Sequence, residues 1–399
     1  MGNFHKGTLI IMIELTQEDI EFLKKAKEIN AKALPREFRF PTASGKMGGP
    51  EPAPGEWVYD YHLFRKYEKP LTPEKIKNKL VEFNKSETVL ADKFRGCILG
   101  LAIGDALGTT NEFRRRGSFE PITDMIGGGP FDLKAGQWTD DTSMAYCLGF
   151  SLLRKNGFDP KDQMDVYTMW WKKGAFSVNG RCFDIGSTVK QALEKYETTA
   201  EPFAGSREPM SAGNGSIMRL APVPLFYFSN PKDILFYSGE SSRTTHGNEE
   251  CISACHYLAA IIQVAINGVE KEEICSSIIT TYDGCWDQFP LSPKIQNIAE
   301  GSYRNKKIDE IKSSGYVVDT LEAALWCFYN SNDFSSGALL AANLGGDTDS
   351  IAAVYGQIAG AYYGETNLPI EWLDKLAYNH IFYIQAEELY NHYQKKKHS

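Results

Sequence analysis

The chain has 399 residues, of which 42% are hydrophobic and 24% are charged. That composition can bury a sizeable core, so it excludes a largely disordered protein. The length exceeds that of one ordinary domain, and we therefore expect one large domain with an appendage. A net charge of -8 offers no general attraction to nucleic acid or to an anionic membrane, so neither is expected as a partner.

The cysteines and the first residues of the chain indicate a reducing compartment. The eight cysteines mostly lie in apolar helical patterns, without the dense spacing of a disulfide scaffold. The start of the chain lacks the long apolar core of a signal peptide, and the longest apolar stretches, such as 257–266, are too short to cross a membrane. We expect a cytoplasmic monomer, with export as an effector by a route that needs no signal peptide as the alternative.

Four side chains, those of Cys251, Cys255, His246 and His256, raise the question of a zinc site. The two cysteines are four residues apart on an apolar helical stripe, and no second cysteine pair accompanies them. We therefore interpret them as buried thiols, which are ordinary in protein cores.

Residues 1–90 are expected to form a helical extension. A capped helix is predicted from Thr16 to about Ala33, and a Pro- and Gly-rich linker follows at about 34–56. A second helix is expected at 73–83, because a proline occupies its first position and a lysine-rich exposed face follows. The extension carries no clustered acids and so offers no metal motif.

The remainder of the chain, about 91–394, shows helical spacing of apolar residues almost throughout, and a basic tail at 395–399 ends it. We therefore predict an all-α main domain. The expected helices cover roughly 92–107, 139–154, 161–173, 186–197, 248–266, 317–329, 348–363 and 369–393.

Two of these helices begin with clustered acids directly after a glycine-containing loop. The clusters are Thr139-Asp140-Asp141-Thr142 and Asp347-Thr348-Asp349-Ser350. One acid at a helix start is explained by capping and by the helix dipole. Two such clusters, each leading into an apolar helix, need a further reason.

Glycines recur every four residues in two of the expected helices. They are Gly96, Gly100, Gly104 and Gly108 in one helix, and Gly356, Gly360 and Gly364 after Ala352 in the other. A glycine inside a helix costs about 1 kcal/mol relative to alanine, so a close approach of two backbones is the expected compensation. Asp349 heads the close-packed face of its helix and Asp105 shares the face of Leu101, so both acids are predicted to point inward.

Carboxylates that converge in a semi-enclosed place repel one another unless cations bind or their pKa values rise. The expected donors are all oxygens, with Thr and Ser hydroxyls beside the carboxylates, which favours Mg²⁺ or Mn²⁺ over zinc. Two acidic clusters suggest two metals, the arrangement of a two-metal hydrolase.

Other segments could border a ligand. The glycine-rich turn from Ser211 to Arg219 could cradle a phosphate with backbone amides and pair it with Arg219, although a plain loop fits equally well. His246, which precedes the helix at 248–266, is either a ligand contact or a structural side chain. Gly127–Pro130 is interpreted as a turn near the site mouth, because it lacks the Lys-Ser/Thr of a nucleotide loop.

Taken together, Gly104-Asp105-Ala-Leu-Gly108 with Glu112 and the two acidic helix starts resemble the ADP-ribosylglycohydrolases. The Ser211 to Arg219 turn and the Thr245-His246 pair fit the same family, and the match spans about 92–393 in the correct order. The resemblance implies an orthogonal all-helical bundle with a binuclear Mg²⁺ site, which removes ADP-ribose from modified protein side chains. The first 90 residues have no counterpart in the minimal family domain.

The resemblance also assigns roles by position. It assigns metal binding to Thr139, Asp140, Asp141, Asp347, Asp349 and Ser350, and catalysis to Glu112 and Asp141. It assigns substrate binding to Asp105, Ser211, Gly213, Asn214, Gly215, Ser216 and His246, with the loop from Ser211 to Gly215 against the diphosphate. Position 350 is Ser, which can bind a metal as Thr does but has a less restricted side chain.

The expected mechanism has two metals that orient the ribose and position a water, with departure from an oxocarbenium-like centre. The Gly-Asn-Gly-Ser-Ile-Met-Arg form of the 213–219 loop favours arginine-linked ADP-ribose, whereas 359–364 favours a serine linkage, and O-acetyl-ADP-ribose is a further alternative. A non-catalytic ADP-ribose-binding relative should have broken acidic motifs, and here they are whole. A two-metal phosphoesterase would release AMP in place of ADP-ribose.

Overall fold

The structure, a computed structural model, describes residues 85–276 and 278–397. The predicted helices at 16–33 and 73–83 and the linker at 34–56 lie outside the described residues. Within them the chain forms helices and loops and contains no strand, which confirms the all-α prediction for this part.

The helices vary widely in length. In chain order they are α4 (Lys85–Gly108), η1 (Thr109–Asn111), α5 (Asp140–Lys155), α6 (Pro160–Lys173), α7 (Ser187–Thr199), η2 (Pro209–Ser211), α8 (Pro222–Phe226), α9 (Pro231–Arg243), α10 (Glu249–Ile266), α11 (Lys271–Ser276), α12 (Cys285–Gln288), α13 (Pro293–Ala299), η3 (Ile308–Glu310), α14 (Val317–Tyr329), α15 (Phe334–Ala342), α16 (Thr348–Tyr363), η4 (Glu365–Asn367), α17 (Ile370–Lys375) and α18 (Asn379–Lys397).

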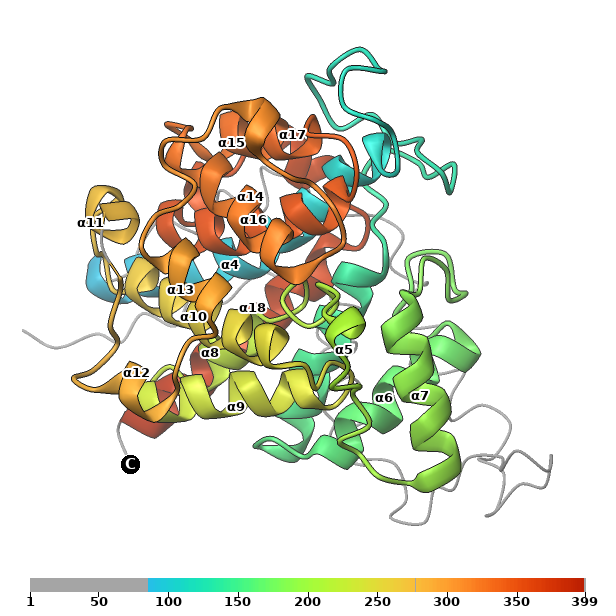
Figure 1. Ribbon diagram of the computed structural model, residues 1–399, viewed down its shortest axis with the longest axis vertical. Coiled ribbons are helices and arrows are strands. Elements are labelled where there is room, and N and C mark those ends of the chain that lie inside the picture. Colours follow the sequence, from blue (N-terminus) through green and yellow to red (C-terminus); the bar gives the residue numbers. More distant parts are fainter. Residues whose placement is uncertain (1–84, 277, 398–399) are drawn as a thin grey trace, which may run out of the picture.

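The central feature is an antiparallel pair formed by α4 and α16, whose backbones touch along the predicted glycine ridges (Figure 1). A Cβ atom placed on Gly96 would lie 2.3 Å from the carbonyl oxygen of Gly360, and one on Gly100 would lie 2.3 Å from that of Gly356. One on Gly104 would lie only 2.0 Å from that of Ala352. No side chain fits between the two helices at these levels, which confirms the predicted close approach.

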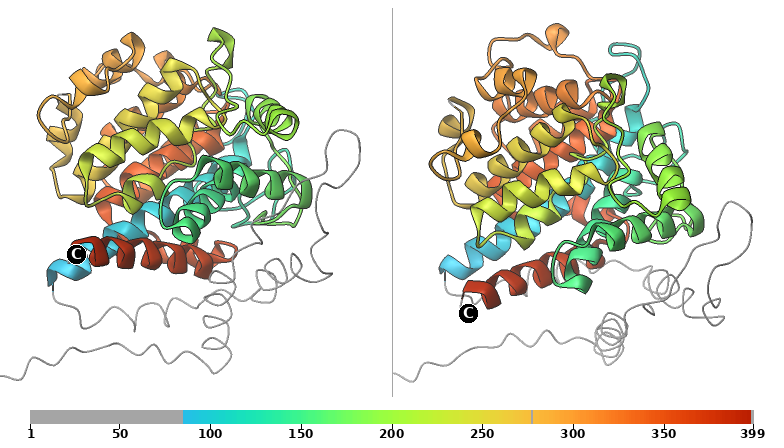
Figure 2. Two further views of the ribbon diagram at one scale, coloured as in Figure 1. Left: turned by 90° about the horizontal axis from the view of Figure 1, so that it is seen from below. Right: turned by 60° about the horizontal axis from the view of Figure 1, so that its bottom comes forward.

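Other helices cover this pair on several sides. α14 and α15 pack on α16, α10 contacts α16 and lies against α9, and α5 packs on α6 and α8. α18 returns beside α4, so that the end of α18 lies next to the start of α4 (Figure 2). Arg95 stabilises the packing of α18 beside α4, because its Nε donates to Glu365 and its Nη1 donates to Glu387, both at 2.7 Å.

Two elements differ from the sequence-based expectation. α4 spans Lys85–Gly108 among the described residues, so it extends further towards the N-terminus than the helix expected at 92–107. The single helix predicted at 369–393 is divided into α17 and α18 by a turn in which Tyr378 has a left-handed backbone with φ of 53°. The break lets the Ala377 amide bond Gly136 O at 2.9 Å and its carbonyl accept from Trp138 Nε1 at 3.2 Å. The turn therefore supports the loop that leads into α5.

The sequence reading missed several shorter helices, among them α8, α9, α11, α12, α13 and α15. Two of them carried a readable start signal. The side chain of Asn230 caps α9 by accepting from the amide of Lys232, and that of Asp333 caps α15 by accepting from the amide of Ser336.

Helix α10 is long and apolar enough, by length and composition alone, to cross a membrane, with a mean hydropathy of 1.2 over 18 residues. However, 83% of that window is buried inside the protein, as expected of a core helix. It was the only such helix in the described part of the chain.

Candidate active site

The start of α5 is fixed by an acid on another helix. Asp105 of α4 accepts hydrogen bonds from the amides of Thr139 and Thr142 and from both of their hydroxyls, at 2.6 to 3.1 Å. The carboxylate is fully buried, and both of its oxygens are occupied. The structure therefore gives Asp105 a positioning role in place of the predicted substrate contact.

Capping does not explain the acids at the two predicted helix starts. The residues at the N-cap positions of α5 and α16 are Thr139 and Asp347, and neither side chain accepts a hydrogen bond from its own helix. The carboxylates that follow, Asp140, Asp141 and Asp349, are all buried. A buried acid that does not cap needs another partner.

Five carboxylates from four segments form two overlapping groups. One group contains Glu112, Asp184 and Asp349, and the other contains Asp140, Asp141 and Asp349, with the ligand atoms of each group within 4.8 Å of one another. Asp349 belongs to both, so the predicted convergence of the two acidic helix starts is confirmed. Glu112 follows η1 at the end of α4, which places the end of the glycine-paired helix at the site.

Two oxygens of these carboxylates have no partner. Asp141 Oδ1 and Asp349 Oδ1 are buried and accept no hydrogen bond from any described residue. Hydroxyls lie beside them, since Ser350 Oγ donates to Asp141 Oδ2 at 3.3 Å and Thr139 Oγ1 lies 3.4 Å from Asp349 Oδ2. Unpartnered buried carboxylate oxygens with hydroxyls nearby fit an oxygen-liganded divalent cation.

Asp184 was missed by the sequence reading. It lies in the loop between α6 and α7 and has a left-handed backbone with φ of 57°, which is costly for a residue other than glycine. No acidic cluster or helix start surrounds it in the sequence. It lies between the helices expected at 161–173 and 186–197, and only the fold brings it to Glu112 and Asp349.

Burial, with mutual repulsion second, raises the pKa values of the carboxyl groups in this site. Burial, followed by the charges of Asp184 and Asp347, raises the pKa of Glu112 to about 10. Burial, followed by the charges of Asp105 and Asp347, raises the pKa of Asp184 to about 7. Burial and neighbouring carboxylates also raise the pKa of Asp140, Asp141 and Asp349 well above the usual range. Such a site favours protons or cations.

The turn after Ser211 approaches this cluster directly. Asn214 Nδ2 donates to Asp347 Oδ2 and, at 2.9 Å, to Thr320 Oγ1, so this amide nitrogen is occupied by the protein. Ser211 Oγ turns away, since it donates to the carbonyls of Ser206 and Glu208. Of the predicted cradle, the amides of Gly215 and Ser216 make no hydrogen bond within the described residues.

His246 lies against this turn. Its Nδ1 is 2.8 Å from the hydroxyl of Thr245, and its Nε2 edge faces Gly213 and Gly215. A Cβ atom on Gly215 would be 2.7 Å from the imidazole, so only glycine lets the ring come so close. Burial and the Arg219 cation lower the pKa of His246 to about 3, and the ring is neutral.

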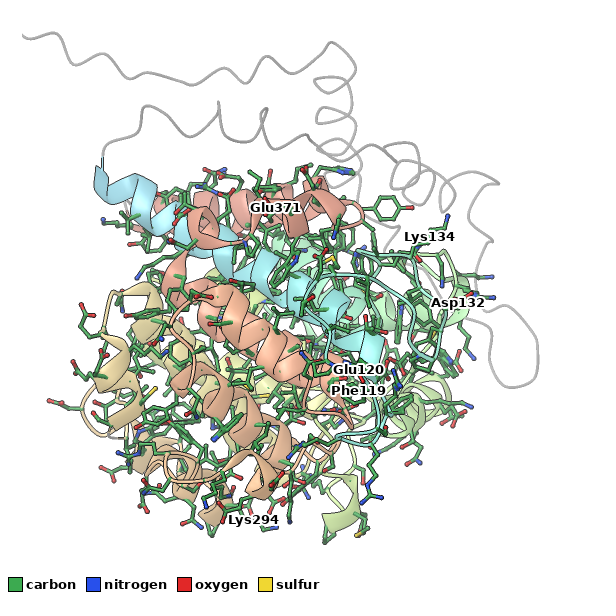
Figure 3. The ribbon with its side chains drawn as sticks, turned by 90° about the horizontal axis from the view of Figure 1, so that it is seen from above. Phe119, Glu120, Asp132, Lys134, Lys294 and Glu371 are labelled. Atoms are coloured by element: carbon green, nitrogen blue, oxygen red, sulfur yellow. The ribbon has the colours of Figure 1, made fainter. Side chains whose placement is uncertain are left out.

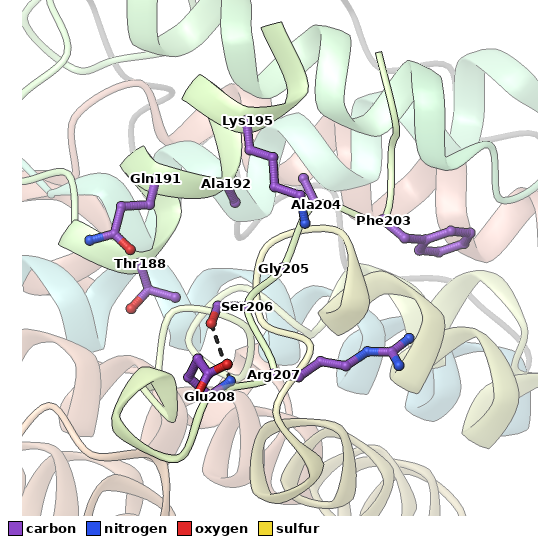
Figure 4. Close-up of a pocket in the computed structure, with 10 residues that line it drawn as sticks. All are labelled: Thr188, Gln191, Ala192, Lys195, Phe203, Ala204, Gly205, Ser206, Arg207 and Glu208. Carbon is purple, nitrogen blue, oxygen red and sulfur yellow. Dashed lines mark hydrogen bonds between the residues drawn. The ribbon is translucent and has the colours of Figure 1, made fainter. Parts of the chain in front are cut away.

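A surface cavity of about 460 Å³ adjoins the same turn (Figure 4). It is lined from α7 by Thr188, Gln191, Ala192 and Lys195, and from the facing loop by residues 203–208. Thr188 also borders Gly213, because a Cβ atom on that glycine would be 3.7 Å from Thr188 Oγ1. The cavity therefore borders the turn at Gly213.

The long loop between η1 and α5 forms an outer edge of the molecule beside the site. Figure 3 labels Phe119, Glu120, Asp132 and Lys134 on it, with Asp132 and Lys134 pointing outward. At the inner end of this loop, Phe113 directly follows Glu112 and is 65% exposed.

The zinc alternative finds no support in the described residues. Cys251 and Cys255 are free and buried, and the side chain of His256 packs edge-on against Phe289. All groups in the described chain that could hold a metal consist of Asp and Glu. The interpretation as buried thiols is confirmed.

Comparison with known proteins agrees with this geometry. The family model described as ADP-ribosylglycohydrolase matches residues 86–399. This chain belongs to the ADP-ribosylglycohydrolase family. The predicted family is therefore confirmed, and the chain is a hydrolase.

Several members of the family with assigned names are similar over most of their length. The ADP-ribosylarginine hydrolase Tri1 of Pseudomonas putida is 45% identical over 300 residues, which cover 75% of this chain and 78% of that protein. The ADP-ribosyl-[dinitrogen reductase] glycohydrolase of Rhodospirillum rubrum is 32% identical and is covered to 90%. A solved structure, titled as an ADP-ribosylglycohydrolase-related protein complex, superimposes with a TM-score of 0.66 at 40% identity. The superposition covers 76% of this chain and 98% of the solved chain. This similarity confirms the all-α fold.

Proposed function

We propose that this family member hydrolyses the bond between ADP-ribose and an arginine side chain of a protein, with two bound divalent cations. Mg²⁺ is the preferred cation and Mn²⁺ is the alternative. The observation that carries the proposal is the pair of acidic groups that share Asp349 and leave two buried carboxylate oxygens without a partner. The similarity to ADP-ribosylarginine hydrolases supports the linkage.

The cations would be held by the residues assigned from the resemblance, with Glu112 and Asp184 beside them. Those residues are Thr139, Asp140, Asp141, Asp347, Asp349 and Ser350. Bound there, divalent cations would neutralise the carboxylates and polarise the ribose hydroxyls next to the scissile bond. Oxygen donors alone make up the set, which suits Mg²⁺.

Two parts of the substrate would bind at two different places in the site. The free amides of Gly215 and Ser216 would bind the diphosphate, and the acidic groups would surround the reacting ribose. The hydrogen bond from Asn214 to Asp347 links the diphosphate turn to the start of α16. The cavity bordered by Thr188 lies beside the turn, and we expect the adenosine end to extend towards it.

Two carboxyl groups, those of Glu112 and Asp184, would handle protons at the reacting bond. Glu112 and Asp184 both lie next to Asp349 and come from different loops. In hydrolysis of a glycosidic bond, one carboxyl group donates a proton to the leaving group and the other takes one from water. A site rich in carboxylates also suits a cationic guanidinium as leaving group.

The test is product analysis with matched arginine-linked and serine-linked ADP-ribosyl peptides, in the presence of Mg²⁺ and in EDTA. We expect release of free ADP-ribose from the arginine peptide, no turnover in EDTA, and severe loss with Asp141→Asn on both peptides. Glu112→Gln should slow the cleavage of one peptide more than that of the other if Glu112 serves one leaving group more than the other. Cleavage of only the serine peptide would overturn the arginine linkage, AMP as product would show a phosphoesterase, and binding of ADP-ribose without cleavage would show a reader.

A further inference from the structure

Arg219 is a buried arginine with no carboxylate partner among the described residues. It is fully buried, although it ends the turn that sequence analysis proposed as a phosphate cradle, so it cannot reach a ligand there. Its guanidinium lies 4.6 Å over the ring of Tyr167, its Nη1 contacts the Met144 sulfur at 3.7 Å, and its Nη2 donates to Thr245 Oγ1 at 2.7 Å. Burying an arginine on these contacts is expensive and calls for a reason.

The contact to Thr245 decides where the proton of that hydroxyl goes. A guanidinium can only donate, so Thr245 Oγ1 accepts from Arg219 and keeps its own single proton for another partner. The remaining hydrogen-bond partner of that hydroxyl in the described chain is His246 Nδ1, at 2.8 Å. If Nδ1 carried a proton, the hydroxyl proton would be buried without an acceptor, which is unfavourable.

The other ring nitrogen then carries the proton. Nε2 of His246 makes no hydrogen bond to a described residue, although the side chain is only 1% exposed, and its edge faces the Gly213 to Gly215 turn. The amides of Gly215 and Ser216 in that turn are also without partners. Three N–H donors of this ring and turn therefore make no hydrogen bond within the described residues, and an anionic oxygen is the acceptor that would suit them.

We propose that Arg219, acting through Thr245, holds His246 in the neutral form protonated on Nε2, so that this N–H donates to a phosphate bound at the Gly215–Ser216 turn. Arg219 and Thr245 are positioning residues and do not touch the ligand. The identity of the phosphate as part of ADP-ribose rests on the proposed function. The tautomer itself is a property of the free protein.

The first measurement is the tautomer, read from nitrogen NMR of the full chain labelled with ¹⁵N-histidine, with the His246 signals assigned by their loss in His246→Asn. We expect Nε2 to be protonated in the wild type and in Thr245→Ser, which keeps the hydroxyl. Thr245→Val, which has nearly the same shape, should show a mixture of tautomers. A wild-type His246 protonated on Nδ1 would overturn the inference, whatever the enzyme activity.

The second measurement is the Kd of ADP-ribose, by titration calorimetry with Mg²⁺ present. We expect the Kd of Thr245→Val to rise by the inverse of its Nε2–H fraction, about twofold for an even mixture of tautomers, and Thr245→Ser to bind like wild type. Thr245→Val should add nothing to the loss caused by His246→Asn, because the hydroxyl acts only through the ring. Additive losses, or equal affinity of Thr245→Val and wild type, would overturn the donor role.

The two proposals fail in different ways. A wild-type chain that has the Nε2–H tautomer but does not bind ADP-ribose would refute the proposed function and, with it, the phosphate donor. A chain that cleaves ADP-ribosyl-arginine while His246 is protonated on Nδ1 would refute the further inference alone.

Discussion

At the scale of single residues, Asp184 is the site residue with the least signal in the sequence. It lies between two of the expected helices, and its left-handed backbone is visible only in the structure. The predicted acids were found because they begin helices that carry readable periodicity. A lone acid in an irregular loop gives no such pattern, so only its approach to Glu112 and Asp349 marks it.

The substitution Asp184→Asn should lower kcat on ADP-ribosyl-arginine by about 100-fold or more, because a proton-handling carboxylate commonly contributes that much. Asn tolerates a left-handed backbone, so the loop should keep its shape. Asp132→Asn is the matched control, since Asp132 also has a positive φ, of 51°, but is exposed and outside both acidic groups. Equal activity of the two variants would remove Asp184 from the mechanism.

Two exposed apolar residues border the site and should contact the protein part of the substrate. Phe113 is 65% exposed beside Glu112, and Met210 is 97% exposed beside Ser211. We expect Phe113→Ala and Met210→Ala to raise KM for an ADP-ribosylated protein several-fold and to leave KM for free ADP-ribosyl-arginine unchanged. Phe236→Ala on α9, 47% exposed, should change neither. Equal effects on both substrates would mean that these residues shape the site and do not contact the protein.

At the scale of elements, the glycine ridges were the part of the fold most fully predicted from the sequence. The repetition of glycine every four residues predicted which faces of the two helices meet and that their backbones approach closely. α4 and α16 pair on those faces. The division of α17 from α18 could not be predicted in the same way. It depends on Gly136, which lies far away in sequence and whose Cβ position is filled by the carbonyl oxygen of Lys375.

Gly104→Ala should destabilise the protein by about 1 to 3 kcal/mol or more, because the added methyl group meets the Ala352 carbonyl and forces the two helices apart. The free energy of unfolding in urea measures this. Gly157→Ala is the control, since a Cβ atom there meets nothing within 4 Å. If both variants are equally stable, the backbones are not in the contact described.

At the scale of the whole molecule, the raised pKa values link stability to pH and to cations. A carboxyl group whose pKa is raised by folding binds more protons in the folded state, so stability falls as pH rises from its unfolded value towards its folded one. For Asp184 that window runs from about 4 to about 7. The melting temperature in EDTA should therefore fall between pH 5 and pH 7.

Adding Mg²⁺ should reverse this loss, and the gain in melting temperature should be larger at pH 8 than at pH 5, because protons compete with the cation at low pH. Calorimetric scans at the two pH values, with EDTA or Mg²⁺, measure it. Asp349→Asn should abolish the gain, since Asp349 belongs to both acidic groups. A gain that survives in that variant would place the cation elsewhere.

The helices of the main domain point to a shorter active form of the chain. Because the family match begins at residue 86, a chain that begins at Lys85 should still hydrolyse ADP-ribosyl-arginine. A chain that begins at Ala91 would cut α4 and should be less stable. If the chain that begins at Lys85 is folded but inactive, the first 84 residues contribute to the site.

The contact between α4 and α16 also limits how the site can diversify. Where backbone atoms of the two helices are in direct contact, their size sets the helix separation, and a substitution that keeps the glycines cannot bring the helices closer. The backbone contact between α4 and α16 thus sets the spacing between Glu112 and Asp349. Changes in substrate preference must come from the segments around it: the loop after Glu112, the loop that carries Asp184, and the turn that faces His246.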